Sequence, residues 1–193
     1  MKKVTLLDDV DALLLKTLSK HPRINQVELA KKMDLTQPAI SLRLRKLKKM
    51  GLLTDMSPQL DAKSLGLKMM KVDMQVKDGY GLMEKFRECP AVVNSYTVEE
   101  SNGMCMILVG ENMPFLNCMV AHHLKKNPDI TNVNSEPVID SLHGFKTCMD
   151  AKHKLDLPPC GDGPCSKCEY YIDNGGECVG CPMTKFYKGT VWK

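Results

Sequence analysis

The sequence has few aromatic residues and no long hydrophobic run. Its 193 residues include only four phenylalanines and one tryptophan, whereas methionine occurs fourteen times. Because methionine is flexible enough to fill gaps that aromatic rings fill elsewhere, we expect methionine-rich cores. No apolar stretch reaches the roughly 18 to 20 residues that a membrane-spanning helix needs. The start, Met1-Lys2-Lys3, is soon followed by acidic residues, which is untypical of a signal peptide. We therefore expect a cytoplasmic protein that is not attached to a membrane.

Cysteine is plentiful, and its count is odd. The chain contains nine cysteines, so they cannot all pair with one another. Since cytosolic thiol pools keep disulfides reduced, the cysteines of a cytoplasmic protein act more often as thiolates or metal ligands. Four of them, Cys89, Cys105, Cys118 and Cys148, are scattered singly, and we interpret each as a small core residue.

Positive charge is concentrated at the N-terminal end. Residues 1–53 contain twelve Lys or Arg and five acidic residues, whereas the rest of the chain contains fifteen and eighteen. A basic segment of this kind attracts phosphates, and its binding releases counterions from nucleic acid. The asymmetry indicates that the N-terminal segment binds double-stranded DNA.

Three short helices are expected within this basic segment. The first begins behind Asp8, whose charge suits the positive end of a helix. The second begins at Asn25, which forms a capping-box pattern with Glu28. The third is capped by Thr36 and ends near Gly51. Three helices in this order are typical of a helix-turn-helix domain.

The third helix has the pattern of a DNA recognition helix. Ile40, Leu44 and Leu47 recur on one helix face, and most of the remaining surface is polar or basic. Early polar residues of such a helix face base edges in the major groove, whereas later lysines contact phosphates. A basic face that is merely solvated is the alternative. The predicted DNA-binding residues are Gln37, Ser41, Arg43, Arg45, Lys46, Lys48 and Lys49, with Gln37, Ser41 and Arg45 reading bases.

The middle of the chain has the periodicity of an α+β domain. Residues 57–66 are rich in turn formers and predict a hinge. A hairpin through residues 101–103 is expected to use Gly103 where a positive φ is needed. Apolar patterns predict strands over residues 70–76, 92–98, 104–109 and 130–139, and helices around 82–86 and 116–124. The order βαββαβ predicts a ferredoxin-like antiparallel sheet with helices on one face.

The N-terminal segment contains a characteristic series of residues: Leu7-Asp8-Asp9-Val10-Asp11, Arg23, Glu28-Leu29-Ala30, Leu35-Thr36, Ala39-Ile40, Arg43, Leu47 and Gly51-Leu52-Leu53. In type and order these residues resemble the winged helix-turn-helix of the Lrp/AsnC (feast/famine) family of transcription regulators. The resemblance covers about residues 5–150. It implies a DNA-binding regulator and not an enzyme, with a winged helix-turn-helix domain followed by a ferredoxin-like domain. It also implies homodimers that often assemble into octamers and bind small effectors between dimers.

One position departs from that family. Gly103-Met104-Cys105 stands where many members have Gly, an aromatic residue and an acidic residue. A free amino acid needs polar partners for its ammonium and carboxylate groups, so the usual effector is not carried over. His122 and His123 lie about 100° apart on the predicted helix and do not easily share one ion. We expect His123 to be half-buried.

The last forty residues differ from the rest of the chain. They contain six glycines and only short apolar runs. A segment of about 40 residues does not bury enough surface to fold alone without a cross-link or a metal. Five cysteines lie here within 22 residues, in the order Cys160-x4-Cys165-x2-Cys168-x9-Cys178-x2-Cys181. Each Cys-x-x-Cys pair places two thiolates on one side of a tight turn, which suits a metal or cluster.

Three kinds of cross-link compete for these thiols. The compartment and the clustering disfavour disulfides. Zinc would use the two Cys-x-x-Cys pairs, but their separation is shorter than the roughly 15 to 20 residues typical of such zinc folds, and Cys160 would have no role. The spacing from Cys160 to Cys168 is that of plant-type ferredoxins, and Cys181-Pro182 resembles the end of a bacterial cluster loop. We expect a 4Fe–4S cluster, with zinc as the alternative.

The predicted metal ligands are therefore the five tail cysteines. A cluster takes four, for which the two Cys-x-x-Cys pairs are the expected set and Cys160 is the spare. Aromatic residues gather in the same segment, and we interpret them as packing residues: Tyr170, Tyr171, Phe186, Tyr187 and Trp192. The predicted organisation is a DNA-binding domain (1–56), a hinge (57–67), a ferredoxin-like domain (68–152) and a cysteine-rich module (153–193).

Together these features predict a DNA-binding regulator whose cluster senses redox state, oxygen or iron. Two alternatives stay open. Sirohaem decarboxylases share the Lrp/AsnC fold and perform tetrapyrrole chemistry, for which the histidines of the second domain are candidates. The basic recognition helix has no obvious use in such an enzyme. The other alternative is a regulator with a purely structural zinc site.

Overall fold

The computed structural model describes residues 7–53, 60–98, 102–141, 146–147, 155–161, 163–172 and 178–192. The chain divides into two units, residues 1–57 and 58–193. The division falls at the start of the predicted hinge. The cysteine-rich residues belong to the same unit as the sheet.

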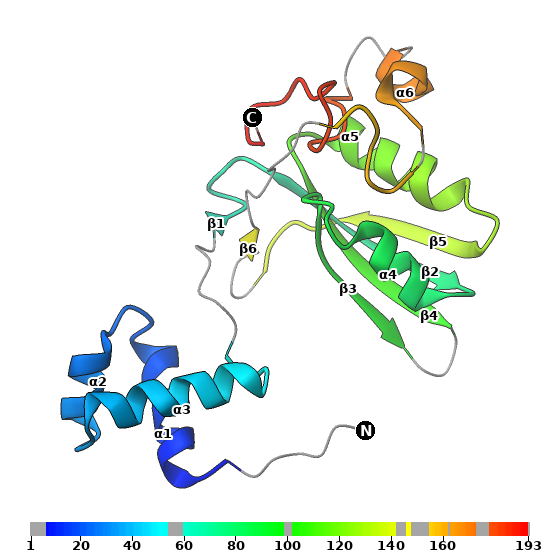
Figure 1. Ribbon diagram of the computed structural model, residues 1–193. Helices are drawn as coiled ribbons and strands as arrows, with labels where there is room; N and C mark the ends of the chain where they lie inside the picture. The colour runs from blue at the N-terminus through cyan, green and yellow to red at the C-terminus, as the bar shows by residue number, and fades with distance from the viewer. Residues whose placement is uncertain are drawn as a thin grey trace. The chain divides into compact units, whose positions relative to one another are not determined.

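Three helices form the N-terminal unit, as predicted: α1 (Asp9–Lys20), α2 (Gln26–Lys32) and α3 (Gln37–Lys49) (Figure 1). The side chains of Asp8, Asn25 and Thr36 each accept a hydrogen bond from the backbone N–H three residues later. These bonds satisfy amide groups that a helix start leaves unpaired. Helix α3 ends before Gly51, whose φ of 73° is one that glycine adopts without strain.

Five fully or nearly fully buried residues form the core of this unit: Leu14, Leu29, Ala30, Ile40 and Leu47. Each helix contributes to it, and the half-buried Leu44 packs against it. The three residues that the helical spacing assigned to the inner face of α3 are therefore those that pack inward.

A four-stranded antiparallel sheet forms the centre of the second unit. Its strands are β2 (Lys68–Val76), β3 (Val92–Val98), β4 (Gly103–Gly110) and β5 (Ile130–Pro137), in the order β3-β4-β2-β5. Helix α4 (Gly79–Phe86) connects β2 to β3. Helix α5 (Met113–Cys118) and the π-helix η2 (Met119–Lys125) connect β4 to β5. This order confirms the predicted ferredoxin-like arrangement.

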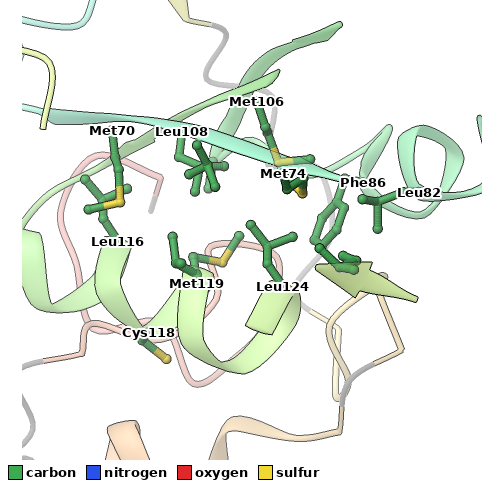
Figure 2. Packing of buried hydrophobic residues seen from close by; sticks show 14 of the residues in the cluster. Met70, Met74, Leu82, Phe86, Met106, Leu108, Leu116, Cys118, Met119 and Leu124 are labelled. Carbon is green, nitrogen blue, oxygen red and sulfur yellow. The ribbon is translucent and has the colours of Figure 1, made fainter. Parts of the chain in front are cut away.

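The core between sheet and helices is rich in methionine (Figure 2). Strand β2 alternates as predicted, with Met70, Val72, Met74 and Val76 buried and the residues between them more exposed. Strand β4 contributes Met104, Met106 and Leu108, and the helices contribute Leu82, Phe86, Leu116, Met119 and Leu124. The sulfur-containing side chains thus take the place of the missing aromatic rings.

The structure differs from the sequence expectations at two places in this domain. The positive φ of the hairpin lies at Asn102 (49°) and not at Gly103, which begins β4. Asparagine tolerates this conformation because its short polar side chain hydrogen-bonds locally. The predicted hinge contains a short strand, β1 (Leu60–Asp61), which pairs with β6 (Lys146–Thr147). The hairpin residues 99–101 lie outside the described residues.

The cysteine-rich tail contains only short elements: the 3-10 helix η3 (Cys165–Lys167) and helix α6 (Glu169–Ile172). It lies beside α5 and η2, as the orange and red segments of Figure 1 show. Residues 173–177 and the single cysteine Cys148 lie outside the described residues. No helix in the described part of the chain has the length and apolar character needed to cross a membrane.

Candidate functional site

The predicted recognition helix presents part of its basic face to solvent. Gln37, Arg45 and Lys49 are exposed, and Ser41 is half-buried. Lys48 is also exposed. Side chains of this kind on the outer face of α3 have the chemistry to donate hydrogen bonds to base edges and phosphates.

Two other basic residues of α3 bind acidic residues of the same unit. The Nη1 atom of Arg43 lies 2.7 Å from Asp8 Oδ2 and 2.6 Å from Asp11 Oδ1. The Nζ atom of Lys46 lies 2.7 Å from Asp11 Oδ2. The Asp11 side chain is fully buried, and the hydrogen bonds from Lys46 and Arg43 lower its pKa. These two predicted DNA contacts therefore also join α3 to α1.

Seven cysteines lie in one region, where the tail packs against α5 and η2. They include all five tail cysteines, and two come from the sheet domain, Cys89 and Cys118. Of the eight cysteines in the described segments, Cys105 is the exception. It lies on the outer face of β4, opposite Asp73 and Tyr96 of the neighbouring strands. We call the seven cysteines the thiol cluster: Cys89, Cys118, Cys160, Cys165, Cys168, Cys178 and Cys181.

Cys118 connects the sheet domain to this cluster. In Figure 2, Leu116 and Leu124 point from the helix toward the sheet, whereas Cys118 points away from it. Its Sγ lies 3.9 Å from the Sγ of Cys168 and is hydrogen-bonded to Cys178. Cys118 is buried, as a core residue was expected to be, but thiols of the tail contribute to its burial.

Tight turns position the tail thiols. The N–H of Cys168 donates to the carbonyl of Cys165 across the first Cys-x-x-Cys pair, at 3.1 Å. The N–H of Cys181 lies 3.4 Å from the Sγ of Cys165, which joins the two pairs. Gly180 has a φ of 80°, and a Cβ there would meet the carbonyl oxygen of Phe186 at 2.7 Å. Glycine is therefore required at this position within the second Cys-x-x-Cys pair.

Cys160 lies near a histidine of the helix. Its Sγ is 3.7 Å from Nδ1 of His123, which is half-buried as predicted. The rings of His122 and His123 are nearly perpendicular, with centroids 5.1 Å apart. The π-helical backbone of η2 therefore presents both rings to the tail side, where they line the same cavity as the thiols.

The thiols differ in their acidity. A hydrogen bond from Cys118 lowers the pKa of Cys178 to about 7, against the effect of burial. The same hydrogen bond and burial raise the pKa of Cys118. Burial also raises the pKa of Cys89 and of Cys181, each to about 12. At neutral pH Cys178 thus carries the most thiolate character among these four, and thiolates are the form that binds metals.

A cavity of about 30 Å³ lies within the thiol cluster. Five thiols line it: Cys118, Cys165, Cys168, Cys178 and Cys181. This volume suits a single ion or water molecule. Among the described residues, however, no three His, Cys, Asp or Glu side chains are close enough together to hold one metal ion. A bound metal therefore requires at least one of the thiols to move.

The end of the tail is held by ordinary packing and hydrogen bonds. Trp192 and Tyr187 are buried against Ala62, Leu67 and other apolar residues near β1 and β2, which confirms their interpretation as packing residues. Glu111 accepts hydrogen bonds from the Tyr187 hydroxyl and from the N–H groups of residues 190 and 191, the last two at 2.7 and 2.9 Å. Burial opposes its ionisation, but these bonds prevail and lower its pKa.

Sequence reasoning missed Cys89 and Cys118 as members of the cluster. Both were interpreted as isolated core residues because neither has a cysteine within metal-binding spacing in the sequence. Cys118 meets Cys168, which lies 50 residues later. No local signal could have indicated this contact.

Comparisons with known proteins extend the fold assignment. Residues 7–54 match the domain family described as winged helix-turn-helix DNA-binding. The transcriptional regulator AzlB of Bacillus subtilis is 22% identical over 142 residues, which are 70% of this chain and 90% of that protein. The HTH-type transcriptional regulator LrpA of Pyrococcus horikoshii is 21% identical, over 71% of this chain and 99% of that protein.

Solved structures show the same fold. That of Escherichia coli AsnC is 18% identical and has a TM-score of 0.60, over 71% of this chain and 95% of that chain. That of the leucine response regulatory protein LrpA of Mycobacterium tuberculosis is 19% identical and has a TM-score of 0.62, over 70% and 94%. The chain therefore has a winged helix-turn-helix DNA-binding domain and the fold of the Lrp/AsnC proteins, and the comparisons support a DNA-binding transcriptional regulator of this type.

Proposed function

We propose that this protein is an Lrp/AsnC-type regulator whose affinity for DNA depends on a 4Fe–4S cluster bound by the thiols of its tail. The cluster responds to redox state, oxygen or iron. The observation that carries the proposal is the thiol cluster itself, in which the two Cys-x-x-Cys pairs and Cys118 surround one cavity. A dense group of buried and half-buried thiols suits a thiophilic metal.

The proposed cluster ligands are Cys165, Cys168, Cys178 and Cys181. All four line the cavity, whereas Cys160 does not and lies beside His123. This supports the role of Cys160 as the spare or alternative ligand. A 4Fe–4S cluster is larger than the cavity, so its binding spreads the thiols and shifts the tail relative to η2.

The proposed DNA contacts are made by the exposed side chains of α3. Gln37 and Arg45 are exposed near the start and middle of the helix, where base-reading residues of a recognition helix lie. Ser41 is half-buried between them. Lys48 and Lys49 follow at the end of the helix, and their charges suit phosphates.

The tail packs against the segment that follows the DNA-binding unit in the sequence, and we propose that this segment transmits a change in the tail to that unit. Tyr187 and Trp192 pack against Ala62 and Leu67, which come soon after the boundary between the two units. A shift of the tail therefore changes the packing around this connection. In a dimer, the spacing of two recognition helices must match half-sites about one helical turn apart, so a small change in this spacing alters affinity.

We propose that the protein binds DNA as a homodimer. Dimers of Lrp/AsnC-type proteins often assemble further into octamers, and we propose the same for this chain. The outer face of the sheet supports this proposal, because side chains such as Tyr96 and Ile107 remain partly exposed on it. The proposed small-molecule effector differs in chemistry from a free amino acid, since Met104 and Cys105 supply no charge.

A structural zinc ion is the second candidate. Two thiolates on one tetrahedral zinc ion lie about 3.8 Å apart, given Zn–S bonds of about 2.3 Å. The Sγ atoms of Cys118 and Cys168 are 3.9 Å apart, which is close to this value. A zinc-bound protein would bind DNA without responding to redox state or oxygen.

The test compares operator binding by cluster-loaded and apo protein. An operator is first selected from random duplexes under anaerobic conditions with each form of the protein. We expect the two forms to differ at least about tenfold in affinity for the selected site, with a smaller difference for random DNA. Zinc-loaded protein is the control. Equal affinities of cluster-loaded and apo protein would falsify cluster control, and a failure of every form to bind DNA contradicts the regulator itself.

A further inference from the structure

We infer that Cys118 binds the metal as well, in the ligand position of one of the four tail cysteines named above, so that the bound metal joins the tail directly to the helix of the sheet domain. This inference rests on the proposed function, because it concerns the ligands of the metal that the tail binds. The ligand class is a thiophilic metal, iron in a cluster or zinc. The five tail cysteines alone do not suggest this site, since Cys118 lies 42 residues before the first of them.

The direction of the Cys118 side chain is the first observation. Cys118 is the last residue of α5, and its side chain points away from the sheet, toward the tail (Figure 2). Neighbouring positions Leu116 and Leu124 fill the core on the other side of the helix. An apolar residue would serve equally well if the position only had to pack against the tail.

The position of its sulfur is the second observation. Two tail thiols approach it, Cys168 at 3.9 Å and Cys178 within hydrogen-bonding distance, and these come from the two different Cys-x-x-Cys pairs. Cys118 thus lies between the pairs. A metal that takes one thiolate from each pair is therefore also next to Cys118.

The cavity is the third observation. Cys118 lines it together with the two pairs, and His122 and His123 line its helix side. Since no three described donor groups are close enough for a single ion, the tail thiols must move relative to a fixed point when a metal binds. The helix supplies that fixed point, because Cys118 is anchored by the buried residues on either side of it.

One consequence is that metal loss releases the thiol-bearing part of the tail from helices α5 and η2, while the aromatic end stays packed near β1 and β2. A metal held only by tail cysteines organises the tail internally and leaves its docking to the aromatic residues. A metal held by Cys118 as well makes docking depend on the metal. A change in the metal would then act on the sheet domain as well as on the tail.

The test measures metal binding by the full-length Cys118→Ser protein, with Cys105→Ser as the matched control. Cys105 is a single cysteine of the same sheet, and it lies outside the thiol cluster. Iron with sulfide, and separately Zn²⁺, are titrated into each anaerobic apo protein in competition with a chelator. We expect Cys118→Ser to lower the metal affinity by about 100-fold or more. Loss of a residue that only hydrogen-bonds to a metal ligand already lowers metal affinity by about 10–100-fold, and loss of a ligand should lower it further. Cys105→Ser should match the wild type.

A second measurement covers the case in which Cys118→Ser fails to fold. In the wild-type protein, the alkylation rate of each cysteine is followed by mass spectrometry before and after metal loading. We expect loading to slow alkylation of Cys118 as much as that of Cys168, with no change at Cys105. Wild-type metal affinity in a folded Cys118→Ser protein, or an alkylation rate of Cys118 that loading does not change, overturns the inference and leaves the proposed function intact. A wild-type protein that binds neither metal overturns both.

Discussion

The N-terminal helical unit and the cysteine-rich tail are both short segments, but they are stabilised in different ways. The helical unit has its own apolar core of five buried residues, and Arg43 and Lys46 pair with Asp11 within the unit. The tail buries its thiols and aromatic residues against other elements, chiefly α5, η2 and the residues around β1 and β2. The helical unit is therefore stabilised by its own residues. The folded structure of the tail depends on the surface of the sheet domain and on the thiols that lie against it.

This difference decides which region can act as a switch. A self-contained helical unit reads DNA with little dependence on conditions. A segment held by thiols loses part of its stabilisation when a metal leaves or a thiol is oxidised. The experiments below test whether the two regions respond separately, from the largest expected effect to the smallest.

Metal removal should separate the two regions most strongly. We expect a chelator to increase tryptic cleavage after Lys167, Lys185 and Lys188 in the tail by about 100-fold or more, since structural metals contribute much of the folding energy of small metal-binding modules. Cleavage within α1–α3 should change little. Equal acceleration in both regions would mean that the metal stabilises the whole chain and not the tail in particular.

Substitution of Arg45 should affect DNA binding and leave the tail unchanged. Arg45→Ala is expected to weaken operator binding by about 1–3 kcal/mol and to relax base preference at one position, because a bidentate contact to guanine has this magnitude. Arg87→Ala is the matched control, because Arg87 is an exposed arginine at the C-cap of α4, outside the helical unit. Electrophoretic mobility shifts with a set of single-base operator variants provide the measurement. An affinity equal to that of the control would remove Arg45 from the recognition surface.

Asp11 should control the stability of the helical unit alone. Asp11→Asn removes the charge that pairs with Arg43 and Lys46, both of which are partly exposed. We expect the free energy of unfolding of this unit to fall by about 1–2 kcal/mol, because charged hydrogen bonds contribute this much and solvent screens the pairs. Hydrogen exchange of the α1 amides measures it. An unchanged exchange rate would show that the ion pairs add no stability.

The same carboxylate predicts an acid dependence. In the folded chain the pKa values of Asp11 and Asp8 are both lower than the ordinary value of 3.8. The ion pairs therefore stabilise the unit fully above that value, and the contribution disappears as the pH falls through the lowered pKa. The Asp11→Asn protein should show a weaker loss of stability over this acid range than the wild type.

Glu111 should have the smallest effect, confined to the end of the tail. Glu111→Gln keeps an acceptor for the Tyr187 hydroxyl and for the N–H groups of residues 190 and 191, but removes the negative charge. We expect cleavage after Lys188 to become roughly three- to tenfold faster, in line with the loss of charge assistance in these bonds. Metal content should not change. A loss of metal would mean that the aromatic end and the thiol cluster are one cooperative structure.

Much of the fold could be predicted because its determinants are local. Asp8, Asn25 and Thr36 cap helices three residues before the amide groups that they bind, and the alternation along β2 spans only a few residues. The positive φ was assigned to Gly103 by residue type, but Asn102 adopts it. Both residues suit such a turn, and the sequence does not distinguish between them.

The candidate site was only partly predictable because its main contacts are long-range. The tail cysteines were identified by their spacing, but the role of Cys118 depends on a contact 50 residues away. Arg43 and Lys46 have the pattern of DNA contacts, whereas the buried carboxylate that binds them lies more than 30 residues earlier. A pattern read along one helix does not reveal what packs against that helix.

The measurement that tests the central claim most directly is a metal and sulfide analysis of anaerobically purified full-length protein, together with its absorption spectrum. The account predicts iron and sulfide in equal amounts, close to four of each per chain, with a broad band near about 400 nm that bleaches in air or on reduction. A colourless protein that contains one zinc ion per chain would contradict the iron–sulfur centre in favour of the structural zinc site. A protein with no bound metal would contradict both.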